Sequence, residues 1–138
     1  MNEYCFADLP IGKRETLVVT VGDADVLAFA QLSGDQSAIH VDDEYAKSRA
    51  FRRRLVHGML SGAYLSGFLG MKLPGKHGLL QSIECQFPAP CYVPSVLTIE
   101  GVVVRRTEAL RVVTVELSII DQAGTVTARA KARSALKQ

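Results

Sequence analysis

Apolar and polar residues alternate through the second half of the chain. The alternation runs over residues 83–87, 113–119 and 126–133, and residues 96–104 are almost continuously apolar. A period of two is typical of strands with one buried face. Turn-forming residues occupy 121–124, between two of these segments. The second half therefore predicts an antiparallel strand meander.

The first half predicts one strand and several helices. Residues 16–21 are β-branched and apolar, which favours a strand. Asp23 is a predicted N-cap for a helix over about residues 24–33, because its side chain can accept hydrogen bonds from free backbone N–H groups. Gly34 then ends that helix. A second, short helix is expected from about Asp43 to Ser48.

The segment from Gly58 to Met71 is uncharged and is apolar or small on every side. Such a composition predicts a helix that protein encloses all round, and Pro74-Gly75 follows it as a stop signal. An antiparallel sheet wrapped around this buried central helix is the simplest architecture, so the fold class is α+β.

Composition narrows the function classes. The chain has 138 residues, 48% of them hydrophobic and 22% charged, which predicts a single folded domain over 1–138. A net charge of +2 gives no indication of nucleic acid or membrane partners. No signal peptide is expected from the start of the chain. Three cysteines without CxxC spacing indicate no disulfide framework and no metal site, and a reducing cytoplasm fits best. P-loop and GxGxxG signatures are absent.

Candidate chemistry lies between the predicted helices. Asp35 and His40 are five residues apart in an expected loop, which can direct a carboxylate and an imidazole to one point. Such a pair moves protons near neutral pH. Gly58 stands where the central helix should begin, and a free N–H at a helix start suits a developing oxyanion. These parts fit the addition of water to a conjugated carbonyl, although other carbonyl chemistry remains open.

Three spaced motifs carry a family resemblance. They are SGDxxxxH at 33–40, DxxYA at 42–46 and FxxxLVHGML at 51–60. In this order they resemble the MaoC-like (R)-specific enoyl-CoA hydratases of the PhaJ type, and the similarity extends over about residues 16–135. The resemblance implies a hotdog fold, with a curved antiparallel sheet around a central helix at about 58–72 and an overhanging helical segment at about 22–56.

The resemblance also implies roles for individual residues. Asp35 and His40 match the catalytic pair, and the N–H of Gly58 matches the donor that binds the thioester oxygen. Ser66 matches a serine beside the pair that orients it. Members of the family form homodimers or dimers of dimers with sites near the subunit interface. One departure is Ser37-Ala38, where the family has Asn-Pro, which puts the loop geometry in question.

The implied activity is reversible hydration of trans-2-enoyl thioesters to (R)-3-hydroxyacyl thioesters, without a resident cofactor. The acyl group is carried on coenzyme A or on an acyl carrier protein, and Arg52 and Arg53 are candidates for binding the phosphates of that carrier. Two alternatives remain. One is a hotdog thioesterase. Many of those enzymes place an essential carboxylate on or near the central helix, and residues 58–71 contain no Asp or Glu, which disfavours this alternative. The other is a non-catalytic acyl-thioester binding protein.

Overall fold

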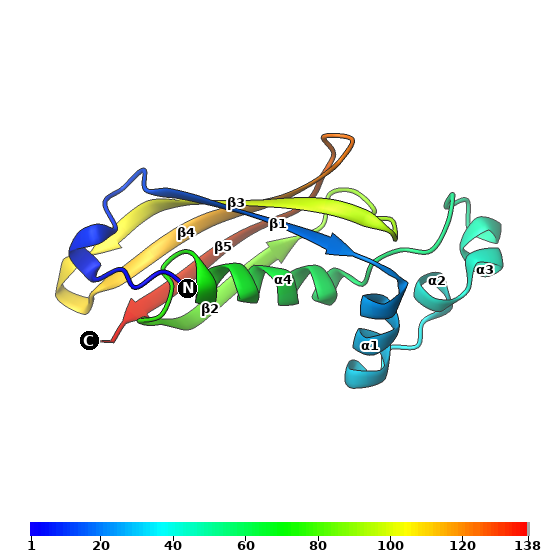
Figure 1. The fold of residues 1–138 in the computed structure, drawn as a ribbon, viewed down its shortest axis with the longest axis horizontal. Helices are drawn as coiled ribbons and strands as arrows, with labels where there is room; N and C mark the ends of the chain where they lie inside the picture. Colours follow the sequence, from blue (N-terminus) through cyan, green and yellow to red (C-terminus); the bar gives the residue numbers. More distant parts are fainter. Residues whose placement is uncertain (138) are drawn as a thin grey trace.

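A five-stranded antiparallel sheet and one long helix form the body of the molecule (Figure 1). The computed structural model describes residues 1–137. The strands, in the spatial order β1-β3-β4-β5-β2, are β1 (Arg14–Val21), β2 (Gly78–Gln86), β3 (Ser95–Thr107), β4 (Val112–Asp121) and β5 (Val126–Leu136). The helices are α1 (Asp23–Ser33), α2 (Ala38–Val41), α3 (Asp43–Ser48) and α4 (Gly58–Met71), with short 3₁₀ turns at Phe6–Asp8 and Glu108–Leu110.

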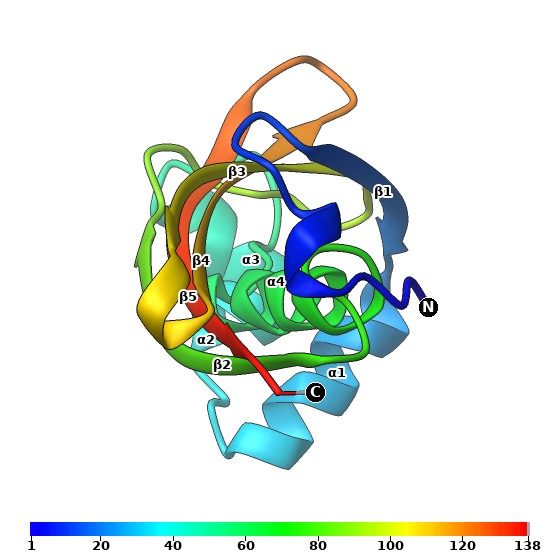
Figure 2. The same cartoon turned by 90° about the vertical axis from the view of Figure 1, so that its left-hand side faces the viewer.

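The sheet curls around α4, as the end-on view shows (Figure 2). Leu65 and Phe68 of α4 are fully buried in one core with strand residues such as Ile99 and Val115. Gly101 of β3 permits this close packing, because a Cβ at that position would lie 2.5 Å from the Phe68 ring. The predicted α+β hotdog architecture is confirmed.

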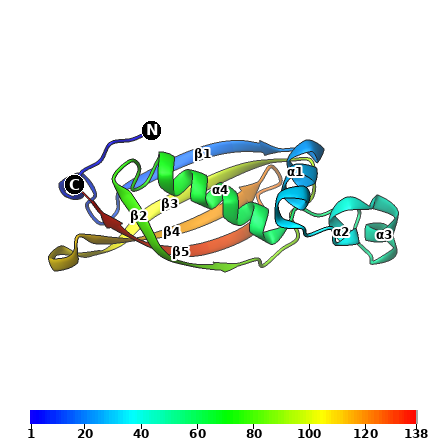
Figure 3. The same cartoon turned by 90° about the horizontal axis from the view of Figure 1, so that it is seen from below.

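Three short helices project beyond one end of the sheet (Figures 1 and 3). α1 and α3 have nearly the predicted bounds, but α2 was not predicted. The prediction that Asp23 caps α1 is wrong. Gly22 is the N-cap, and its N–H donates to a carboxylate oxygen of Asp25 at 2.8 Å. Asp42 caps α3 by accepting from the first-turn N–H groups.

The prediction that protein encloses the central helix on every side is wrong for one chain. One face of α4 is open (Figure 3), and on it Met59 is 66% and Met71 48% exposed. β2, at the sheet edge, is likewise exposed along most of its length instead of half-buried as its alternation predicted. The cause is the same for both. The curled sheet covers only part of the helix surface, and no further strand pairs with β2 within residues 1–137.

A short extended segment, Arg54–His57, joins the projecting helices to the body, and we call it the tie segment. On the body side, the Val56 N–H donates to Cys91 O at 2.8 Å and the Val93 N–H donates to Arg54 O at 3.2 Å. On the other side, the Leu55 N–H donates to Ile39 O at 3.0 Å. The tie segment therefore fixes the position of α2 relative to α4. Within residues 1–137, no helix has both the length and the apolar character needed to cross a membrane.

Candidate active site

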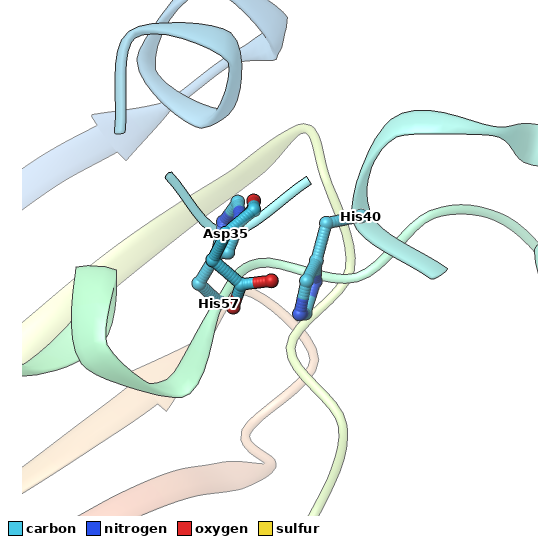
Figure 4. A group of neighbouring side chains, drawn as sticks. All are labelled: Asp35, His40 and His57. Carbon is cyan, nitrogen blue, oxygen red and sulfur yellow. The ribbon is translucent and has the colours of Figure 1, made fainter. Parts of the chain in front are cut away.

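Asp35, His40 and His57 lie together where the projecting helices meet the start of α4 (Figure 4). One nitrogen or carboxylate oxygen from each side chain lies within 4.8 Å of the others. Asp35 stands in the loop after α1, His40 in α2 and His57 at the end of the tie segment. The structure thus brings the predicted pair together. It differs from the prediction in placing His40 on a helical turn and in adding a second histidine.

His40 is held as a neutral imidazole with a defined tautomer. Its Nδ1 lies 2.8 Å from the carbonyl oxygen of Leu55, and because a carbonyl can only accept, Nδ1 carries the hydrogen. Nε2 is then left with a lone pair. The side chain is only 9% exposed, and this burial is the main reason that the pKa of His40 lies below its ordinary value. Near neutral pH, Nε2 of His40 is therefore a proton acceptor.

Asp35 is exposed and ionised, and Ser37 fixes its carboxylate. The Ser37 hydroxyl donates to Oδ1 of Asp35 at 2.6 Å and the Ser37 N–H donates to the same oxygen at 3.1 Å. These two bonds lower the pKa of Asp35 below its ordinary value, and the bond from the hydroxyl has the larger effect. At the position where the family has asparagine, Ser37 still supplies side-chain support to this loop.

Gly58 begins α4, so its N–H has no acceptor within the helix. Within residues 1–137 no side chain caps this helix end. Gly58 and His40 both line a cavity of about 390 Å³. A Cβ at Gly58 would lie 3.2 Å from the ring of Phe87, which also lines the cavity, so a side chain at this position would crowd that ring.

The cavity wall is largely apolar, and its apolar members are Phe51, Leu55, Val56, Phe87, Pro88, Ala89, Pro90 and Cys91. Burial raises the pKa of the Cys91 thiol to about 11, so that thiol stays protonated. A protonated thiol is a poor nucleophile. The cavity therefore suits an acyl chain that is bound without forming an acyl-cysteine.

The same three side chains offer ligand types that metals accept, but their geometry favours proton transfer. The rings of His40 and His57 are stacked, with centroids 3.9 Å apart and planes inclined by 25°. Ring-nitrogen lone pairs lie in the ring plane, so those of the two stacked rings lie in nearly parallel planes, which disfavours their meeting at one ion. One nitrogen of each ring donates to a backbone carbonyl, which leaves one lone pair on each ring.

The other predicted site residues are not brought to the pair within one chain. Ser66 is exposed on the open face of α4, about 12 Å along the helix axis from Gly58. The Arg52 guanidinium lies over the ring of Tyr92 at 4.2 Å, and Arg53 donates to Pro94 O at 3.4 Å. The roles assigned to these three residues stay predictions.

Fold and site together define a hotdog protein whose projecting helices carry a carboxylate–imidazole pair beside a helix start and an apolar cavity. A family model described as the MaoC like domain matches residues 7–123. The chain belongs to the MaoC-like domain family.

Two curated relatives bear the name (R)-specific enoyl-CoA hydratase. The chain is 36% identical to the one from Aeromonas caviae over 116 residues, which cover 84% of this chain and 87% of that one. It is 34% identical to the one from Rhodospirillum rubrum over 95 residues, covering 69% of this chain and 66% of the relative.

Solved structures agree with this assignment. The (R)-hydratase from A. caviae involved in PHA biosynthesis superimposes with a TM-score of 0.89 at 34% identity, covering 94% of this chain and 98% of that one. The R-hydratase PhaJ1 from Pseudomonas aeruginosa gives a TM-score of 0.90 at 27% identity, covering 96% and 85%.

We predict that Ser37→Ala raises the pKa of Asp35 toward its ordinary value, because the variant loses the hydroxyl that donates to Oδ1. A carboxylate-detected NMR titration, with the signal assigned through Asp35→Asn, measures this directly. Since the stability contributed by a depressed carboxyl pKa is lost as pH falls through the folded-state value, the variant should also lose less stability on acidification. Ser118→Ala, in β4, is the control. An unchanged Asp35 titration would contradict the assignment of Ser37.

Proposed function

We propose that this chain is an (R)-specific hydratase that adds water reversibly to trans-2-enoyl thioesters. The observation that carries the proposal is one arrangement of three groups. Nε2 of His40 has a lone pair, an Asp35 carboxylate oxygen lies within 4.8 Å of a ring nitrogen of His40, and the free N–H of Gly58 lies on the same cavity as His40. The curated relatives that bear this activity in their names support it.

Both members of the pair are proton acceptors in the resting protein. Asp35 is ionised and His40 is neutral near pH 7, since both pKa values lie below their ordinary values. The proton that reaches the product must then come from the attacking water. As the water oxygen bonds to C3, its proton passes to the pair, and the pair returns a proton to C2 on the same face of the substrate. The product is the (R)-3-hydroxyacyl thioester.

The electron pair of the C2=C3 bond moves toward the thioester oxygen during this step. The Gly58 N–H at the start of α4 is suited to hold that charge, because the helix end adds a positive field to the donated hydrogen bond. Loss of one such donor in comparable enzymes costs roughly 3–4 kcal/mol of transition-state stabilisation. The apolar cavity would hold the acyl chain, with the reacting carbons near His40.

We predict that the wild type hydrates crotonyl-CoA and that Asp35→Asn and His40→Ala each lower kcat by about 10²–10⁴-fold, the range for loss of a general acid or base. Following absorbance of the enoyl thioester measures the rate, and chiral analysis of the product should give the (R) isomer. The control is Glu44→Gln, an exposed α3 carboxylate that pairs with Lys47 and lies outside the group of three.

Two results would overturn the proposal. Release of free thiol without hydration would favour a hotdog thioesterase. Tight binding of crotonyl-CoA without turnover, unaffected by Asp35→Asn, would favour an acyl-thioester binding protein.

Arg52 and Arg53 are proposed to bind the phosphates of coenzyme A or of an acyl carrier protein. Arg54, by contrast, is engaged with Asp23 and Asp43 in salt bridges. Arg52 is exposed, and the guanidinium fork suits phosphate oxygens. We expect Arg52→Glu combined with Arg53→Glu to raise KM with little change in kcat, while Arg105→Glu in β3 has no effect. Unchanged KM values for both enoyl-CoA and enoyl-carrier substrates would contradict this role.

A homodimer is proposed to cover the open face of α4. Met59, Ala63, Ser66, Gly67 and Gly70 lie on one stripe of the helix and are all exposed. Ser66 belongs to this stripe and is too far from the pair in its own chain, so its predicted role beside a catalytic pair needs a second copy.

The free cysteines support a cytoplasmic location for the protein. Fractionation of the producing cells tests this proposal.

We predict a solution mass of twice the 15.0 kDa of one chain, or a higher even multiple, by light scattering. Met71→Glu should shift the protein toward monomer and lower kcat, whereas Val18→Glu, at an exposed apolar position of β1, should do neither. Ser66→Ala should keep the mass and lower kcat about tenfold, the effect of one hydrogen bond. A fully active monomer would contradict the proposal.

A further inference from the structure

His57 contacts both members of the candidate pair, but the proposed reaction gives it no part in proton transfer or in binding the thioester oxygen. Its side chain is 1% exposed. Its Nε2 lies 3.0 Å from the backbone carbonyl oxygen of Asp35, so Nε2 carries the hydrogen and donates it. Its ring stacks on His40 at 3.9 Å, and the ring of Phe29 meets it at 4.9 Å in an edge-on arrangement.

The hydrogen bond from His57 to Asp35 connects the loop of residues 34–37 to a segment that is distant in sequence. The other hydrogen bonds of residues 34–37 are local, for example Gly34 N–H to Ala30 O and the two bonds from Ser37 to Asp35. Within residues 1–137, the bond from His57 is the one that joins this exposed loop to a segment distant in sequence. Without it, the loop that carries the Asp35 carboxylate has no hydrogen bond to the body.

Packing alone does not account for a histidine at this position. Nδ1 of His57 is buried and has no hydrogen-bond partner within the described part of the chain. A buried polar atom without a partner costs free energy, which an apolar side chain of similar size would avoid. The Nε2 donor is the feature that an apolar side chain lacks.

We propose that His57 is a positioning residue, which holds the backbone of Asp35 through Nε2 and the ring of His40 through stacking so that both side chains face one water molecule. The inference rests on the proposed hydratase function. The position of His57 itself is fixed by its two neighbours, because Val56 is hydrogen-bonded to Cys91 and Gly58 begins α4. One residue thus relates the carboxylate, the imidazole and the oxyanion donor.

Two substitutions separate positioning from packing. His57→Leu keeps the apolar volume and removes the donor, whereas the amide nitrogen of His57→Gln can reach the place of Nε2. We expect His57→Leu to fold and to lower kcat for crotonyl-CoA by about 10²-fold, since small displacements of reacting groups have effects of that size. KM should stay within about threefold, because the cavity lining does not include His57. His57→Gln should recover about tenfold of the lost kcat. His77→Leu, in the loop before β2, is the matched control and should behave as wild type.

A second readout reports on His40 itself. The titratable groups that face His40 are His57 and Asp35. Replacing His57 by Leu removes a neighbouring imidazole that disfavours the charged form of His40, so the pKa of His40 should rise in an NMR titration.

The outcomes are distinguishable from a failure of the proposed function. If the wild type hydrates crotonyl-CoA and Asp35→Asn does not, the function stands. If, in that case, His57→Leu retains wild-type kcat and the His40 titration is unchanged, or if Leu and Gln lower kcat equally, the positioning role is wrong. Loss of thermal stability in both variants with unchanged kcat per folded molecule would likewise assign His57 to packing alone.

Discussion

The hydrogen bonds of the tie segment Arg54–His57 are the constraint on which the candidate site depends. In an extended chain, successive residues face opposite sides, and here the two sides have different partners. Val56 is bonded to Cys91 of the body, whereas Leu55 and His57 are bonded to the projecting loop and helix. A four-residue segment therefore fixes two separately formed parts of the molecule relative to each other.

This arrangement explains how very short elements can carry an acid/base pair. α2 has only four residues, too few to be stable through its own hydrogen bonds. Leu55 stabilises it twice, by donating to Ile39 O and by accepting from His40 Nδ1. The second bond also sets the tautomer of His40. Position, tautomer and orientation of the imidazole thus follow from the same backbone residue, and Leu55 also lines the apolar cavity.

Much of the fold could be predicted from the sequence, because period-two alternation and an uncharged helical segment are strong local signals. The same signals could not show that one face of α4 and the edge strand β2 lack partners in a single chain, because small and apolar residues on an open face give the same pattern as residues in a core. At the site, Asp35, His40 and Gly58 could be predicted from spacing and motif. The Leu55 carbonyl could not, because every residue has one. Ser37 was recognised only as a departure from the family pattern, and α2 was too short for periodicity to indicate.

The most direct test of the account is a crystal structure of the wild-type protein with butyryl-CoA, a saturated thioester that cannot be hydrated. We expect the thioester oxygen about 2.7–3.1 Å from the Gly58 nitrogen, the acyl chain in the apolar cavity, and one water molecule in contact with both Nε2 of His40 and the Asp35 carboxylate. A thioester bound with its oxygen away from the start of α4, or a complex in which the two side chains contact no common water, would contradict the account.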